Sequence, residues 1–184
     1  MNVMIISSAS TNIDSCYIKL ARDVSKYLAE NEFDLVYGGA SFSMMGACYE
    51  EFLKHGRNIY AFTTEKYSSD LENLKGAKCF IKKTTFEMKQ SMFEVSDLIV
   101  VLPGGYGTLS ELLSYIEENR SNDKDIPIEI YDIENYYQKL FDMLDFIKEK
   151  GFASSSFNDY VGISHNENEF KDSIDKYLIK KRRK

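Results

Sequence analysis

The sequence contains few of the residues that build metal centres or disulfide frameworks: three cysteines and two histidines among 184 residues. Cys16, Cys48 and Cys79 are irregularly spaced, no CxxC pair occurs, and His55 and His165 are far apart in the sequence. Zinc sites need clustered Cys and His ligands, and disulfide frameworks need an even set of cysteines. We therefore predict buried free thiols and neither a metal nor another cofactor.

Long apolar runs are also absent. None approaches the roughly 20 residues that a membrane-spanning helix requires. The apolar segment Val3–Ile6 is too short for the core of a signal peptide, and no basic run precedes it. We expect a cytoplasmic protein that does not bind a membrane.

Positive charge is scarce outside one short segment. The net charge is −6, and five of the 23 basic residues form the C-terminal tail Lys180–Lys184, so the rest of the chain is more acidic still. An acidic body argues against general nucleic-acid binding, because binding to the phosphate backbone needs basic surface. We expect the tail to be solvated and frayed.

The apolar segments that are present alternate between strand-like and helix-like patterns. Val3–Ser7 is continuously apolar, as in a strand buried on both faces, whereas Tyr17 to Leu28 shows helical spacing of apolar residues. With only two prolines and no linker, we predict a single α/β domain over residues 1–184 with a Rossmann-like, doubly wound, mostly parallel sheet and helices on both faces. The predicted strands are 3–7, 33–37, 58–63, 77–81, 98–102, 126–131 and 160–164; the predicted helices are 17–28, 43–55, 84–95, 133–148, 167–179 and one after 108. The most apolar strand, 98–102, is expected at the centre.

Two glycine pairs follow predicted strands. Gly38-Gly39 comes after the second strand, and Gly104-Gly105 comes after strand 98–102. In open parallel sheets, ligands bind beyond the carboxyl ends of the strands. We expect both pairs to border one shared pocket.

The second pair belongs to a loop with the composition of an anion site. Pro103 ends the strand, three glycines occur within Gly104–Gly107, and a helix is predicted to begin near Thr108. Glycines permit positive φ and close approach of backbone N–H groups, and a helix N-terminus adds unpaired N–H groups and a positive dipole end. The pattern favours a phosphate-binding loop over a plain turn, and it differs from both GxGxxG and GxxxxGK[ST].

Glu111 follows Thr108 at a spacing with two interpretations. Thr108-x-x-Glu111 fits a capping box, in which the carboxylate only stabilises the helix. Alternatively, Glu111 lies off the apolar stripe and faces the pocket as a functional carboxylate. The local pattern favours neither.

These residues resemble a known family. The segment PGGYGTLSE (103–111) resembles the PGGxGTxxE motif of the cytokinin-riboside 5′-monophosphate phosphoribohydrolases, the lysine-decarboxylase-like "Lonely Guy" family. LVYGGASFSMMGA (35–47) is similar to the family's LVYGGGxxGLMGx, and Ser7-Ser8 and Met88-Lys89 match its Gly-Ser and Arg-Lys pairs in position.

The resemblance implies a homodimer that hydrolyses the N-glycosidic bond of a nucleoside 5′-monophosphate without a cofactor. It implies that Glu111 is the catalytic carboxylate, an expectation that suits the oxocarbenium-like transition state of glycosidic cleavage. The residues then expected to bind the substrate, chiefly its 5′-phosphate, are Ser8, Gly38, Gly39, Met88, Lys89, Gly104, Gly105, Tyr106, Gly107, Thr108 and Ser110.

The main departure from the family is Met88, which stands where the family has its catalytic arginine. Helical spacing with Met92 and Val95 explains Met88 as a core residue. Methionine cannot supply the charge of a guanidinium. The sequence thus leaves two alternatives: an enzyme of altered base preference, or a nucleotide- or cofactor-binding sensor or carrier without catalysis.

Overall fold

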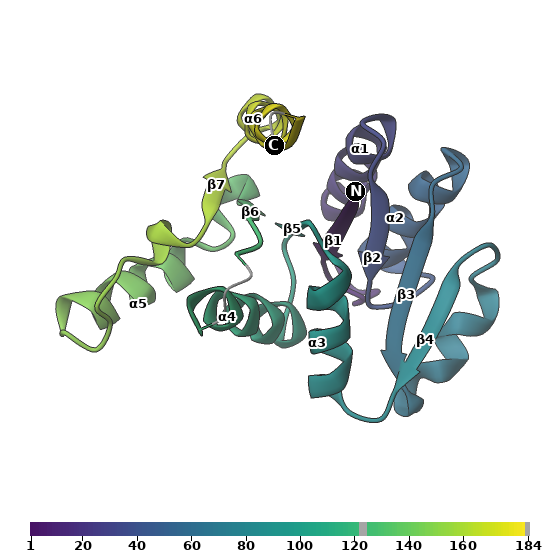
Figure 1. The fold of residues 1–184 in the computed structure, drawn as a ribbon, viewed down its shortest axis with the longest axis horizontal. Helices are drawn as coiled ribbons and strands as arrows, with labels where there is room; N and C mark the ends of the chain where they lie inside the picture. Colours follow the sequence, from purple (N-terminus) through teal and green to yellow (C-terminus); the bar gives the residue numbers. More distant parts are fainter. Residues whose placement is uncertain (122–124, 183–184) are drawn as a thin grey trace.

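The computed structural model of the chain describes residues 1–121 and 125–182. A seven-stranded sheet runs through it in the order β4-β3-β2-β1-β5-β6-β7, and every neighbouring pair is parallel (Figure 1). The strands are β1 (Asn2–Ile6), β2 (Asp34–Tyr37), β3 (Ile59–Thr64), β4 (Lys78–Lys82), β5 (Leu98–Val101), β6 (Ile128–Tyr131) and β7 (Gly162–Ser164). The predicted Rossmann-like parallel sheet is confirmed.

Helices cover both faces of the sheet, as doubly wound folds require. One apolar cluster includes side chains of α1 (Ser15–Glu30), α2 (Ser43–Lys54) and α6 (Glu167–Arg182). The other includes side chains of α3 (Thr85–Val95), α4 (Tyr106–Ser121) and α5 (Gln138–Glu149). Three 3₁₀ helices complete the regular structure: η1 (Glu65–Asn73), η2 (Ile133–Asn135) and η3 (Phe157–Asp159).

The continuous apolar run of β1 is explained by these two clusters. Val3 and Ile5 belong to the α1/α2/α6 cluster, whereas Met4 and Ile6 belong to the α3/α4/α5 cluster. Successive side chains of a strand point to opposite faces, so a strand covered on both sides is apolar at every position.

The predicted start of the helix at 84 is also confirmed. The Thr84 Oγ1 accepts the Glu87 N–H at 3.1 Å, and the Glu87 carboxylate accepts the Lys83 N–H at 3.1 Å. Two backbone donors at the N-terminus of α3 are thereby satisfied.

Three expectations about the elements are wrong. The middle strand is β1, and β5 lies beside it, because full burial on both faces gives several strands the same apolar composition. The helix predicted at 133–148 is divided into η2 and α5, since Glu134 and Asn135 both adopt φ +56°. Finally, α4 begins at Tyr106, two residues before Thr108.

The termini and cysteines need similar corrections. Cys48 is buried as predicted, but the free thiols of Cys16 and Cys79 are exposed. The basic tail is helical as far as Arg182, and Lys181 Nζ donates to Asp97 Oδ1 at 3.1 Å. Residues 183–184 of the predicted frayed tail lie outside the described residues. Within the described ranges, no helix combines the length and apolarity needed to cross a membrane.

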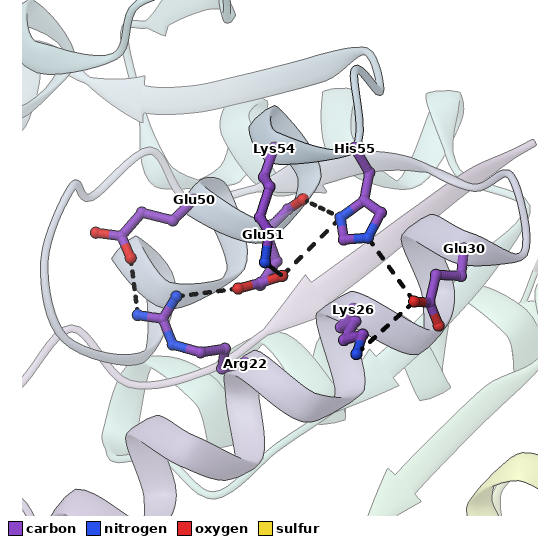
Figure 2. A network of polar contacts seen from close by, with 7 residues as sticks. All are labelled: Arg22, Lys26, Glu30, Glu50, Glu51, Lys54 and His55. Carbon is purple, nitrogen blue, oxygen red and sulfur yellow. Dashed lines mark hydrogen bonds and ion pairs between the residues drawn. The ribbon is translucent and has the colours of Figure 1, made fainter.

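A polar network joins α1 to α2 (Figure 2). Arg22 of α1 donates to Glu51 Oε1 at 3.1 Å and to Glu50 Oε2 at 2.7 Å, and Glu51 is buried. His55 Nδ1 lies 2.8 Å from the Glu51 carbonyl oxygen. The network fixes the two helices that supply one wall of the cavity described next.

Candidate functional site

A cavity of about 180 Å³ lies at the carboxyl edge of the sheet, where β1 and β5 are neighbours. The chain leaves β1 toward β2 on one side and leaves β5 toward β6 on the other. This is the topological switch point, at which open α/β sheets bind ligands. The lining residues are Ser8, Ser10, Ile13, Tyr17, Met44, Pro103, Gly104, Gly105 and Tyr136.

The glycine-rich loop contributes Pro103, Gly104 and Gly105 to the lining of this cavity. A Cβ on Gly104 would overlap the side chain of Thr108, which is buried against it. Gly105 and Gly107 have open space where a Cβ would stand. None of these three glycines has a positive φ, so that part of the expectation is wrong, whereas the expected open access to the backbone is present at Gly105 and Gly107. They are accounted for by close packing at Gly104 and by open access to the backbone at the other two.

The loop leads directly into α4. The Leu109 N–H donates to the Gly105 carbonyl at 3.0 Å, so Gly105 is the N-cap residue and Tyr106 the first helical residue. Unpaired N–H groups of this first turn and the helix dipole therefore point toward the cavity edge. Tyr106 itself is 94% exposed.

The helix start at Tyr106 also bears on Glu111. Thr108 is the third residue of α4 and cannot act as its N-cap, so the capping box that the sequence suggested does not form. Glu111 lies on the second turn and is partly exposed. Burial of the carboxylate raises its pKa to about 7, and the nearby Lys89 ammonium partly opposes that rise. Such a pKa suits an acid or base that works at neutral pH.

Lys89 fastens α3 to α4 beside Glu111. Its Nζ donates to the Ser110 carbonyl at 3.2 Å, to Ser110 Oγ at 2.8 Å and to Ser114 Oγ at 3.0 Å. Lys89 contributes to a separate hollow of about 260 Å³ between these helices rather than to the cavity at the switch point. Met88, one residue before it, is half-buried and packs against the α3/α4/α5 cluster.

Gly38 and Gly39 are not among the residues that line this cavity, in contrast to Gly104 and Gly105. Gly38 packs against Met45, and a Cβ on Gly39 (φ +80°) would lie 2.8 Å from Leu71 Cδ2. Both serve the local packing of the β2–α2 connection, which reaches the cavity through Met44. Ser8 does line the cavity, and its Oγ accepts the Ser10 N–H at 3.0 Å.

Two tyrosines at the site were missed by the sequence analysis. Tyr136 lines the cavity and donates its hydroxyl hydrogen to the Gly104 carbonyl at 2.9 Å. Its neighbour Tyr137 donates to the Leu102 carbonyl at 2.7 Å and is buried. Together they brace the glycine loop from the β6–α5 connection. Nothing in the sequence indicated that these tyrosines contact the loop, because both lie within the segment predicted to be a helix.

Comparison with known proteins identifies the family to which the chain belongs. Residues 45–174 match the family described as "Possible lysine decarboxylase". The chain belongs to this family. It is 32% identical over 154 residues to a probable cytokinin riboside 5′-monophosphate phosphoribohydrolase of Oryza sativa subsp. japonica, covering 81% of this chain and 65% of the rice protein. A cytokinin riboside 5′-monophosphate phosphoribohydrolase of Arabidopsis thaliana is 31% identical over 151 residues, covering 80% of this chain and 69% of that protein.

Solved structures of the same fold include cofactor carriers. The molybdenum cofactor carrier protein of Chlamydomonas reinhardtii superposes with a TM-score of 0.71 at 12% identity, covering 97% of this chain and 98% of that one. The molybdenum cofactor binding protein of Rippkaea orientalis gives a TM-score of 0.66 at 17% identity, covering 96% and 95%. At these identities the likeness establishes the fold of this family member and nothing more.

Proposed function

We propose that the chain hydrolyses the N-glycosidic bond of a nucleoside 5′-monophosphate, releasing the free base and ribose 5-phosphate. The observation that carries the proposal is the pairing, on one helix, of an accessible glycine N-terminus with the Glu111 carboxylate, whose pKa is about 7. The relatives named as phosphoribohydrolases support the same reaction class.

The 5′-phosphate is bound by backbone groups in this proposal. Open space over Gly105 and Gly107 lets the phosphate approach the N–H groups of the first turn of α4. Ser8 and Ser10 add hydroxyl groups across the cavity. Because the cavity's described lining contains no charged side chain, phosphate affinity depends on these N–H groups and on the helix dipole.

Glu111 then serves the reacting sugar. Cleavage breaks the bond between C1′ and the base nitrogen and forms a bond from C1′ to a water oxygen. The ionised carboxylate stabilises the oxocarbenium-like sugar and accepts a proton from the attacking water, and the departing base takes up a proton. Glu111 lies outside the cavity lining, one turn further along α4, so the substrate extends from the phosphate loop over the start of the helix.

The test is base release from a panel of purine and pyrimidine ribonucleoside and deoxyribonucleoside 5′-monophosphates, followed by chromatography. We expect Glu111→Gln to reduce the rate by about 100-fold or more. Glu117→Gln, an exposed position on the same helix, is the matched control and should stay within about twofold of the wild type. Undiminished release by Glu111→Gln would contradict the proposed mechanism.

A second candidate function is favoured by Met88. With a half-buried methionine at the arginine position of the family motif, the site lacks the guanidinium charge of that motif, which favours a nucleotide or cofactor carrier that binds without cleaving. Tight nucleotide binding with no base release would support the carrier. Met88→Arg separates the two: a gain in base release identifies a weak enzyme, and no gain favours the carrier.

We also propose that the chain forms a homodimer. Exposed apolar side chains on the α3 side of the sheet include Phe80 of the edge strand β4, which stacks on Phe62 of the α3/α4/α5 cluster, and Phe86 of α3 (69% exposed). Exposed apolar surface of this kind is typical of protein interfaces.

A further inference from the structure

Two tyrosines give the switch-point cavity an aromatic wall. They are Tyr17, from the first turn of α1, and Tyr136, from the β6–α5 connection, whose hydroxyl is hydrogen-bonded to Gly104 of the glycine loop. Their rings meet edge to face, with centroids 5.9 Å apart and planes at 71°. Two segments more than 100 residues apart in sequence thus build one wall.

The size of the cavity limits what it can enclose. At about 180 Å³ it is below the roughly 300–1,000 Å³ typical of sites that enclose a whole small-molecule ligand. A phosphate and part of a sugar fit within it, and the rest of a nucleotide must lie at its mouth. Tyr136 is 44% exposed there, so part of its ring is available to a ligand.

The position of Tyr136 is set by the backbone before it and by a hydrogen bond from its hydroxyl. Glu134 and Asn135, just before it, are consecutive non-glycine residues at φ +56°, a conformation that is costly for L-residues. The Tyr136 hydroxyl is occupied by its hydrogen bond to the Gly104 carbonyl. The part of Tyr136 that remains available to a ligand is therefore its ring. The hydrogen bond to Gly104 fixes this ring relative to the glycine loop.

We propose that Tyr17 and Tyr136 are the specificity-determining residues that recognise the nucleobase, by packing their rings against it while the glycine loop holds the phosphate. The inference rests on the proposed function, because it takes the ligand to be a nucleoside 5′-monophosphate. An aromatic wall is suited to any flat base, since every base has a π-face. It favours ligands with a base over ribose 5-phosphate alone.

The experiment compares the affinities of AMP and ribose 5-phosphate by isothermal titration calorimetry, with Glu111→Gln as the parent protein so that AMP is not cleaved during the titration. Stacking on an aromatic side chain accounts for about 5- to 150-fold in affinity. We expect the parent protein to favour AMP by about fivefold or more. Tyr17→Leu and Tyr136→Leu should each weaken AMP binding about fivefold or more and leave ribose 5-phosphate unchanged, whereas Tyr17→Phe, which keeps the ring, should retain the preference.

Phe152→Leu is the matched surface control, because Phe152 is 86% exposed, follows the end of α5 and is not among the residues that line the cavity. Circular dichroism establishes that each variant is folded. Retention of the AMP preference in both leucine variants, or equal affinity of the parent protein for the two ligands, overturns the role of the two tyrosines while the phosphate site stands. Failure of the parent protein to bind either ligand overturns the proposed function as well.

Discussion

Two glutamates on α4 have pKa values shifted in opposite directions. Burial raises the pKa of Glu111 to about 7, whereas hydrogen bonds from Arg120 and Ser121 lower that of the fully solvated Glu117. Environments that separate the pKa values of like groups are a common feature of acid–base sites. The contrast within a single helix distinguishes Glu111 from an ordinary surface glutamate.

The raised pKa of Glu111 predicts a pH-dependent stability. From its ordinary value of 4.5 up to about 7, the folded state binds more protons than the unfolded state, so the free energy of unfolding falls as pH rises through this window. Glu111→Gln removes the ionisation. We expect the variant to be more stable than the wild type by about 1–2 kcal/mol at pH 8, and to have no advantage at pH 4.5 or below.

Urea unfolding at several pH values measures this difference, with Glu117→Gln as the control on the same helix. Because the pKa of Glu117 is lowered rather than raised, its variant should show no gain in stability at pH 8. A pH-independent difference between Glu111→Gln and the wild type would show that the carboxylate is not buried as described.

The sequence could predict the glycine-rich turn between β5 and α4 but could not decide the role of Glu111. The capping-box interpretation depended on whether α4 began at Tyr106 or at Thr108, and a sequence with three glycines in four residues does not locate a helix start that closely. The contribution of Tyr136 to the cavity could not be predicted for a related reason. The αL conformations of Glu134 and Asn135 interrupt a segment whose apolar spacing is otherwise helical.

Among the elements, the pairing of α1 with α2 is the contact that holds Tyr17 and Met44 in place. The polar part of this contact is centred on Glu51, whose side chain is only 6% exposed (Figure 2). The strongest ion pair of Glu51 is with Arg22, whose side chain is 42% exposed. A buried carboxylate that loses its partner is destabilising, because its desolvation is no longer offset.

We therefore predict that Arg22→Leu lowers the free energy of unfolding by about 1–3 kcal/mol, measured by urea titration. The double variant Arg22→Leu/Glu51→Leu should recover most of this loss, since it removes the stranded charge. Lys19→Leu, which breaks only the exposed Lys19–Asp23 pair, should cost about 0.5 kcal/mol or less. Additive losses in the double variant would argue against the buried pair.

The elements themselves were predictable because each strand is a short apolar run and each covering helix an amphipathic one. The order of the strands in the sheet was less predictable. Both β1 and β5 are buried on two faces, and composition alone cannot say which is central. The edge strand β4 is exposed, yet its Cys79, Phe80 and Ile81 form a short apolar run between two lysines, and that run alone does not reveal an edge.

At the scale of the whole molecule, β4 is an edge strand of the sheet, beside β3 (Figure 1). Its Phe80 and Ile81 side chains are exposed. Natural proteins usually protect such edges by charge, by cover or by pairing. Phe86 on α3, the helix that follows β4 and packs against it, is also exposed. A second copy of the chain, joined through a two-fold axis, would bury this surface in a self-complementary interface.

We predict that the wild type sediments as a dimer in analytical ultracentrifugation and that Phe86→Glu sediments as a monomer. The substitution places a charge in an apolar contact, where its desolvation is costly. Phe152→Glu introduces the same charge at an exposed phenylalanine beyond the end of α5 and should remain dimeric. A monomeric wild type, or a Phe86→Glu variant that still dimerises, would contradict this interface. Because Lys89 and Ser114 line the hollow next to Phe86, the dimer contact borders the turn of α4 that carries Glu111, and loss of the dimer should also reduce base release.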